Sequence, residues 1–268
     1  MEKIIEVHPP RQIHSKRDVR AWFQRFLLPC VPLRWLSWFR LLRGQPRLAT
    51  KVLVWGQGRV GSTALISCFP TEQVHQMDEV LGPHLKPWSP MWLPDDAAAF
   101  LDKLALTQGA QRAAIAHVKP EHVGTDRHLV VPFLQQAHAL GWRVVHLERR
   151  NSLAQGHSFL RARSLGIYNT EDPDAAREAS GRKFEPSPEA IQAAVWRNEV
   201  NNHFNRESLS ASGIPFVRVS YESLFEGSAE ETSAALQALG ESLALGFALQ
   251  PPTTKKVSPA LPMGDQGG

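Results

Sequence analysis

The sequence has few cysteines and no long apolar segment, and these absences exclude several classes of protein. Only Cys30 and Cys68 occur among the 268 residues, so we expect neither a disulfide framework nor a cysteine metal cluster. Arginines and prolines interrupt the most apolar stretch, residues 22–42, well short of the ~20 apolar residues that span a bilayer. The first ten residues also lack the apolar core of a secretory signal. Together these features favour a cytoplasmic protein without a membrane-spanning helix.

Positive charge is concentrated at the start of the chain. The formal net charge is +4, but the first fifty residues carry ten lysines and arginines against three acidic residues. We therefore predict three segments: a basic N-terminal extension over residues 1–50, an α/β domain over 51–250 and a flexible C-terminal tail over 251–268.

Tryptophans and arginines alternate within this extension, over Trp35–Arg43, and two interpretations remain open. The segment lies on an anionic membrane surface as a basic amphipathic helix, or its aromatic side chains pack on the domain or on a partner subunit. We favour packing, because large exposed apolar patches are uncommon. Nothing else in the chain suggests nucleic acid as a partner, and the sequence does not indicate an oligomeric state.

Strand and helix patterns alternate from residue 51 onward, without an internal repeat. Short apolar, β-branched runs predict five strands, over residues 51–55, 71–77, 112–118, 143–147 and 216–220. Longer segments with helix start and stop signals predict helices over residues 62–69, 95–107, 128–140, 151–164 and 188–211. This alternation is typical of an α/β fold with a central parallel sheet flanked by helices.

The first predicted strand runs into a glycine-rich turn, Gly56-Gln-Gly-Arg-Val-Gly-Ser-Thr63. Its three glycines permit a tight turn, and Ser62 then begins a helix. Such a turn directs unpaired backbone N–H groups and the positive end of the helix dipole at one point, which suits an anion. We therefore predict a phosphate site here.

Two of the three kinds of phosphate site that this turn resembles are poor matches. The three glycines have the spacing of the dinucleotide fingerprint, with Asp78 or Glu79 as the acidic residue for the ribose. The turn also matches a Walker A loop except that Ser62 replaces the lysine, so ordinary ATP or GTP binding is not expected.

The third match rests on Arg59-Val-Gly-Ser-Thr63, a cation followed by a Gly-Ser-Thr helix start. This segment resembles the 5′-phosphosulfate loop of sulfotransferases that use 3′-phosphoadenosine-5′-phosphosulfate (PAPS). That family has a second motif, a strand followed by an arginine and, one short helix later, a serine. Arg150 and Ser158 follow the predicted strand over residues 143–147 at the family's spacing. The resemblance extends over about residues 51–224.

The resemblance implies a P-loop-like sulfotransferase fold and a role for several residues. Arg59, Gly61, Ser62 and Thr63 would bind the phosphosulfate of PAPS, and Arg59 would also contact the transferring group. Arg150 and Ser158 would bind the 3′-phosphate, because a guanidinium grips a phosphate dianion with two hydrogen bonds. The product would be 3′,5′-adenosine bisphosphate (PAP), and no metal is required.

The sequence leaves the catalytic base open between two residues. Met77-Asp-Glu-Val-Leu81 resembles a Tyr-Glu-Pro-Leu segment of carbohydrate sulfotransferases, which places Glu79 at the glutamate. His84 is the alternative base, a short loop away. Lys119, after the third strand, is predicted to position or polarise the acceptor.

These residues predict transfer of a sulfuryl group from PAPS to a hydroxyl or amine of a carbohydrate, a lipid or a small metabolite. Two alternatives remain open. An NAD(P)-dependent Rossmann oxidoreductase would account for the glycine spacing and the acidic pair. A non-catalytic nucleotide-binding module of the same fold would keep the phosphate sites without the chemistry.

Overall fold

A computed structural model describes residues 48–79, 81–82, 94–107, 111–165 and 184–252, together with Pro32, Trp35 and Leu36. Most of the predicted extension and nearly all of the predicted tail therefore lie outside the described residues, and the three-segment division stays a prediction. Within the extension, Leu36 is buried against the domain core and Trp35 is exposed. No helix in the described ranges is both long and apolar enough to cross a bilayer.

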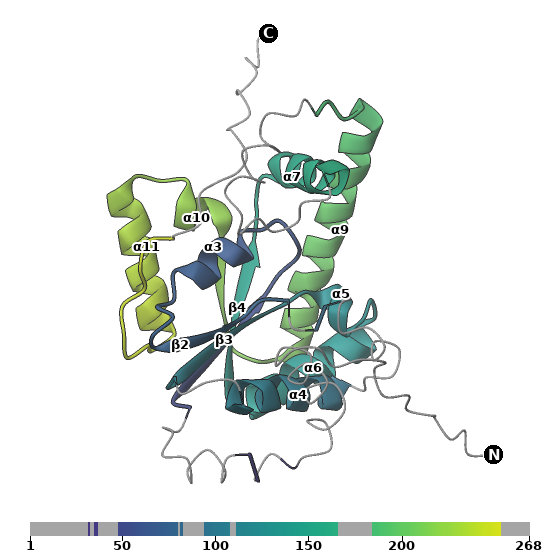
Figure 1. The fold of residues 1–268 in the computed structure, drawn as a ribbon. Helices are drawn as coiled ribbons and strands as arrows, with labels where there is room; N and C mark the ends of the chain where they lie inside the picture. Colours follow the sequence, from purple (N-terminus) through teal and green to yellow (C-terminus); the bar gives the residue numbers. More distant parts are fainter. Residues whose placement is uncertain are drawn as a thin grey trace, which may run out of the picture.

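The centre of the molecule is a sheet of five parallel strands in the order β2-β3-β1-β4-β5 (Figure 1). The strands are β1 (Thr50–Trp55), β2 (Val74–Met77), β3 (Ala113–Val118), β4 (Trp142–Glu148) and β5 (Phe216–Ser220). All five agree with the sequence prediction to within three residues at either end. The fold class is confirmed as α/β with a parallel sheet.

Helices cover both faces of this sheet (Figure 1). One face carries α4 (Pro94–Thr107), α6 (Arg127–Ala139) and α9 (Pro188–Ser212). The other carries α3 (Ser62–Ser67), α10 (Tyr221–Phe225) and α11 (Ala229–Ser242). A short helix α5 (Pro120–Val123) follows β3, and α7 (Ser152–Leu165) packs on α9. The sequence analysis did not predict α5, α10 and α11.

Local sequence explains where the longer helices begin and end. The side chain of Asp126 caps α6 by accepting a hydrogen bond from the backbone N–H of His128. In α9, Ser187 caps the first turn, and the helix ends at Gly213 in the left-handed conformation. A reciprocal capping box between Ser228 and Glu231 begins α11.

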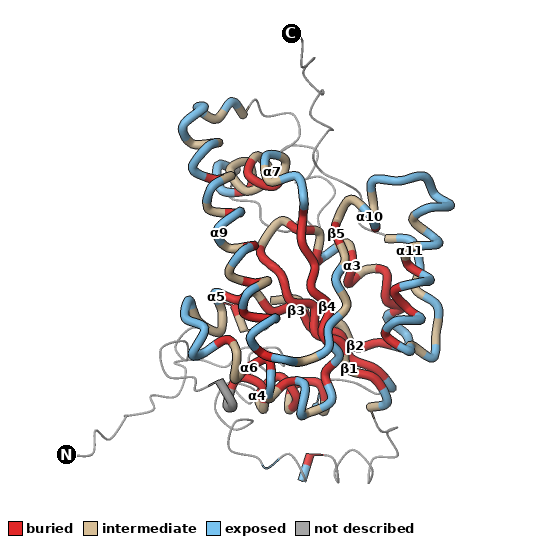
Figure 2. The backbone as a smooth tube through the Cα atoms, turned by 180° about the vertical axis from the view of Figure 1, so that it is seen from behind, coloured by how far each residue is buried: buried red, intermediate tan, exposed pale blue. Residues whose placement is uncertain are grey.

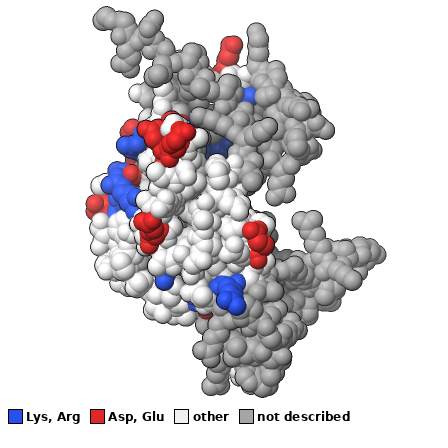
Figure 3. Space-filling view, turned by 90° about the vertical axis from the view of Figure 1, so that its left-hand side faces the viewer, with Lys and Arg blue, Asp and Glu red and all other residues white. Residues whose placement is uncertain are grey.

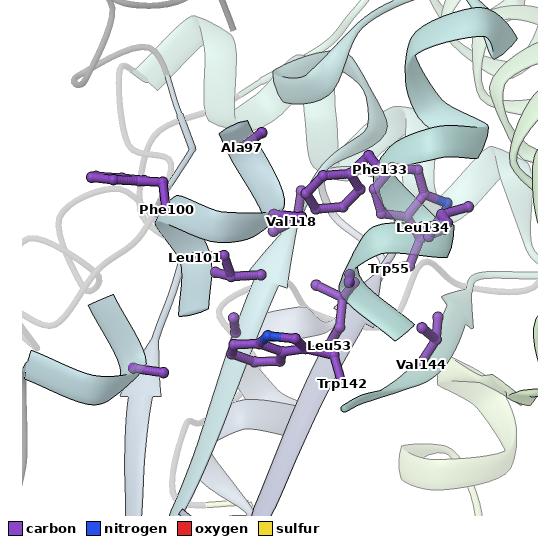
Figure 4. Packing of buried hydrophobic residues seen from close by; sticks show 14 of the residues in the cluster. Leu53, Trp55, Ala97, Phe100, Leu101, Val118, Phe133, Leu134, Trp142 and Val144 are labelled. Atoms are coloured by element: carbon purple, nitrogen blue, oxygen red, sulfur yellow. The ribbon is translucent and has the colours of Figure 1, made fainter. Parts of the chain in front are cut away.

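The core lies in two layers, because alternate residues of each strand point to opposite faces. In β1, Leu53 and Trp55 pack toward α4 and α6, whereas Val52 and Val54 pack toward α3 and α11. Trp55 stacks on Phe133 with ring centroids 5.8 Å apart (Figure 4). The central strands β1, β3 and β4 are buried along almost their whole length, whereas the edge strands β2 and β5 are partly exposed, as are the outer faces of α9 and α11 (Figure 2).

The described surface on the α11 side of the molecule carries both acidic and basic side chains. Acidic and basic side chains lie there in small separate groups among uncharged atoms, without a continuous basic area on the described residues of that face (Figure 3). Nucleic-acid binding requires clustered lysine and arginine, so this face does not have the charge pattern of such a surface.

The face of α9 that packs against the sheet is unusually polar. Its buried residues include three asparagines, Asn198, Asn202 and Asn205. Opposite them on β4, Glu148 is buried and forms ion pairs with Arg218 at 2.6 Å and with Arg206 at 3.3 Å.

His146, two residues before Glu148 on the same strand, is fully buried, and neither ring nitrogen has a hydrogen-bond partner among the described residues. Burial lowers the pKa of His146 from 6.5 to about 4; the Glu148 carboxylate opposes this shift, and Arg218 and Arg206 add to it. The folded state therefore holds this histidine neutral.

Because the pKa of His146 is lower in the folded state, the unfolded chain binds one more proton between about pH 6.5 and 4. The free energy of unfolding should therefore be highest above pH 6.5 and should decrease by about 3 kcal/mol as the pH is lowered to 4. We expect His146→Leu to remove that part of the pH dependence of the free energy of unfolding. Urea titrations at pH 7.5, 5.5 and 4.5 measure it, with His203→Leu, an exposed histidine of α9, as the control. Equal pH dependence in the wild type and His146→Leu would contradict this prediction.

Candidate functional site

The predicted site residues follow strands that end at one edge of the sheet. Arg59 follows β1, Glu79 follows β2, Lys119 follows β3 and Arg150 follows β4. In open parallel sheets, ligands bind beyond the carboxyl ends of the strands, where the strand order reverses. Here that point is β1, which lies between β3 and β4, so the turn after β1 occupies the position expected of a ligand site.

The two ends of the turn between β1 and α3 pack so closely on neighbouring residues that only glycine fits there. A Cβ atom on Gly56 would lie 2.5 Å from the carbonyl oxygen of Leu147. Gly61 is left-handed, with φ of 92°, and a Cβ atom there would lie 2.4 Å from Cδ2 of Tyr221. Between them, Arg59 also has a positive φ, 67°, which is uncommon for a residue with a side chain. The conformation of the turn thus presents Arg59 at its tip.

Arg59 joins the two motifs found in the sequence. Its Nε donates a hydrogen bond to Oγ of Ser158 in α7 at 3.0 Å. A second contact links the same elements, because Gln155 of α7 donates to the carbonyl oxygen of Gly58 at 3.0 Å. Burial lowers the pKa of Arg59, the charge of Arg149 lowers it further, and Glu79 opposes both. Two arginines and a carboxylate therefore act on one another electrostatically at this point.

The two arginines after β4 have different environments. Arg150 has a side chain that is 66% exposed and pairs with Glu222 at 3.7 Å. Arg149 is only 8% exposed, its guanidinium lies 4.5 Å from the centre of the Tyr221 ring, and its Nε has no hydrogen-bond partner among the described residues. The carboxylate of Glu222 also accepts hydrogen bonds from the backbone N–H groups of Arg150 and Asn151, which fixes the start of α7.

Glu79 and Lys119 form an ion pair beside the turn. The Lys119 ammonium lies 2.6 Å from Oε1 of Glu79 and close to the backbone of Gly58. Glu79 has a φ of 47°, a left-handed conformation that is unfavourable for glutamate and is found more often at functional sites. Both side chains are largely buried, so their charges act on the site in a medium of low polarity.

Asp78 connects the end of β2 to β3 and to α3. Its carboxylate lies 2.9 Å from Nδ1 of His117 and accepts a hydrogen bond from the Thr63 hydroxyl at 3.2 Å. Burial alone would raise the pKa of Asp78, but the contacts with His117 and Thr63 and the charge of Lys119 lower it below the ordinary value.

Asp78, Glu79 and His117 bring three potential metal ligands within 4.8 Å of one another. Each ligand group already contacts a protein partner, since Asp78 binds His117 and Thr63, and Glu79 binds Lys119.

Comparison with known proteins identifies the family. The family model described as Stf0 sulphotransferase matches residues 110–260, which is more than half of the chain. The chain belongs to the Stf0 sulphotransferase family. The match includes β3, β4, α7, α9 and β5, and therefore Arg149, Arg150 and Ser158; the turn after β1 lies before the matched residues. A search of curated proteins finds no match.

The family and the strand order both disfavour the Rossmann alternative. In the dinucleotide fold β1 lies next to β2, whereas here β3 separates the two strands. Of the two acidic residues that this alternative offered for a ribose, Asp78 bonds instead to His117 and Thr63, and Glu79 pairs with Lys119.

The structure brings together most of the residues predicted from the sequence, and their roles stay predictions. Arg59, Ser158, Glu79 and Lys119 converge on the turn, while the Arg150 side chain is directed largely to solvent. His84 lies outside the described residues. The sequence analysis did not assign a role to Arg149, His117 or Tyr221, although a histidine in the otherwise apolar β3 sequence was a detectable signal.

Replacing Gly61 by alanine should distort the turn, because the new methyl group would overlap the Tyr221 ring. Gly213→Ala is the matched control, since Gly213 is also left-handed, with φ of 67°, but has no atom within 4 Å of the added Cβ. We expect Gly213→Ala to cost about 1 kcal/mol of stability and Gly61→Ala to cost about 1–3 kcal/mol more. Urea denaturation of both variants measures the difference. Equal losses would show that Tyr221 does not confine the turn.

Proposed function

We propose that the protein transfers a sulfuryl group from PAPS to a hydroxyl or amine of an acceptor, and that Arg59 and Ser158 lie at the centre of the donor site. The observation that carries this proposal is the hydrogen bond between them, which joins the phosphosulfate motif and the 3′-phosphate motif in one site. Membership of a sulphotransferase family supports the class of reaction.

The residues at this edge of the sheet fit a donor with several phosphate charges. Arg59 and Arg149 lie close enough for each charge to affect the other, an arrangement that an anion between or beside them stabilises. The Nε atom of Arg149 is buried and has no hydrogen-bond partner within the described ranges, so it offers a donor to such an anion. Arg150 adds a cation at the start of α7, at the place where the family resemblance puts the 3′-phosphate.

PAPS supplies a sulfuryl group attached to a good leaving phosphate. On the protein side, Arg59 stabilises negative charge as it increases on the oxygen that joins sulfur to the 5′-phosphate. Glu79 removes the proton of the acceptor hydroxyl as the new oxygen–sulfur bond forms and the old one breaks. Lys119 holds Glu79 in place through the 2.6 Å ion pair.

The acceptor proposed is a carbohydrate, a lipid or a small metabolite that presents a hydroxyl or amine near Glu79. The resemblance of the Glu79 segment to carbohydrate sulfotransferases favours the first class. The segments that follow Glu79 and α7 in the sequence, residues 83–93 and 166–183, lie outside the described residues.

Exchange of Glu79 for glutamine should separate binding from chemistry. Glutamine keeps the size of the side chain but does not accept a proton, so transfer should fall by about 10²–10⁴-fold while PAP binds with nearly unchanged affinity. Transfer of ³⁵S from labelled PAPS to a panel of sugars, lipids and phenols measures the first quantity, and calorimetry with PAP measures the second.

Two further variants make this result specific. Glu207→Gln, which changes an exposed glutamate paired with Arg127, should leave both quantities unchanged. Loss of transfer in His84→Ala but not in Glu79→Gln would assign the base to His84. Tight PAP binding without transfer to any acceptor, over a broad panel, would instead support a non-catalytic nucleotide-binding module.

A further inference from the structure

His117 is a buried titratable residue to which the proposed mechanism gives no role. It lies near the carboxyl end of β3 on the face that carries α3, and its side chain is fully buried. Its Nδ1 lies 2.9 Å from Oδ1 of Asp78, and its Nε2 lies 3.3 Å from the carbonyl oxygen of Gly56. The ring therefore lies directly between the start of the turn after β1 and the end of β2.

Both partners of this ring accept hydrogen bonds. The Gly56 carbonyl oxygen has only lone pairs, and the Asp78 carboxyl is held ionised by its contacts with His117, Thr63 and Lys119. The ring lies within contact distance of both acceptors, and either of its nitrogens can carry the proton that is donated.

The same contacts connect the two ends of the turn. Gly56, where the turn begins, is bound by His117; Thr63, in the first turn of α3, donates to Asp78, which His117 also binds. Arg59 lies between these two anchored points, with its unfavourable positive φ. Glu79 directly follows Asp78, so the same anchor also fixes the residue that we propose as the base.

We propose that His117 is a positioning residue that clamps the turn from Gly56 to Thr63 at the donor site. This inference rests on the proposed function, because the anion that benefits from the clamp is the phosphosulfate. His117 contacts no reacting atom; it acts through Gly56 and Asp78.

The clamp is tested without ligand by NMR of ¹⁵N-labelled protein. His117→Gln should shift the backbone amide resonances of Gly56 to Thr63, whereas Asp102→Asn should leave them in place. Unchanged resonances of this turn in His117→Gln would overturn the proposal.

The positioning role is tested by the affinity for PAP, measured by calorimetry. His117→Gln does not bridge Asp78 and Gly56 as the ring does, so the turn should lose its position and PAP binding should weaken about ten-fold or more. The matched control is Asp102→Asn, because Asp102 is also a carboxylate paired with a cation, Lys51, at the opposite edge of the sheet. Asp102→Asn should lower the melting temperature and change PAP affinity less than about two-fold.

The outcomes separate this inference from the proposed function. A His117→Gln protein that is destabilised like Asp102→Asn but binds PAP as tightly as the wild type would give His117 only a structural role and overturn the clamp. A wild-type protein that does not bind PAP would contradict the proposed function, whereas the NMR measurement tests the clamp without any ligand.

Discussion

The close packing of the turn between β1 and α3 is the constraint on which the rest of the site depends. Gly56 lies against the backbone of β4, and Gly61 lies against the ring of Tyr221, so a side chain at either position would displace the turn from the sheet edge. This confinement holds Arg59 at the tip, where it meets Ser158 of α7. Because these contacts come from β4, α7 and α10, the site forms only when the whole carboxyl edge of the sheet is assembled.

Charge at this edge is arranged in cation–carboxylate pairs that leave guanidinium groups near the turn. Lys119 pairs with Glu79, and Arg150 pairs with Glu222. Arg149 lies 3.8 Å from Glu226 and stacks on Tyr221, yet its Nε has no hydrogen-bond partner in the part of the chain that the structure describes. Such ion pairs keep these side chains ordered when no anion is bound, and the Nε of Arg149 remains able to donate a hydrogen bond to an anion.

The fold was largely predictable because burial of a parallel sheet imposes a simple pattern. Apolar, β-branched runs gave all five strands, and proline, glycine and cap residues gave the ends of the long helices. The helix α11 was missed, although the Ser228 and Glu231 capping box marks its start. The order of the strands was not predictable, because it depends on which strands pair with one another in the sheet and not on the sequence of any single strand.

Short motifs predicted residues in two parts of the candidate site, whereas its other residues are brought in by contacts between segments that are distant in the sequence. Arg59 and Ser158 were both identified from short motifs, and their hydrogen bond spans 99 residues. Sequence spacing favoured Arg150 over Arg149, because the family pattern counts residues and does not report burial. The structure adds the buried neighbour, Arg149, and the Asp78–His117 pair, whose partners come from different strands.

The most direct test of the central claim compares thermal unfolding of the protein with PAP, 5′-AMP and NAD. A ligand at ~100 times its dissociation constant stabilises the folded state by about 2.7 kcal/mol. Because charge-assisted contacts contribute about 1.5–3 kcal/mol each, loss of the 3′-phosphate should weaken binding at least ten-fold. The account predicts that PAP raises the melting temperature more than 5′-AMP or NAD at equal concentration, and that Arg150→Ala removes the difference between PAP and 5′-AMP. Equal stabilisation by PAP and 5′-AMP in the wild type, or greater stabilisation by NAD, would contradict it.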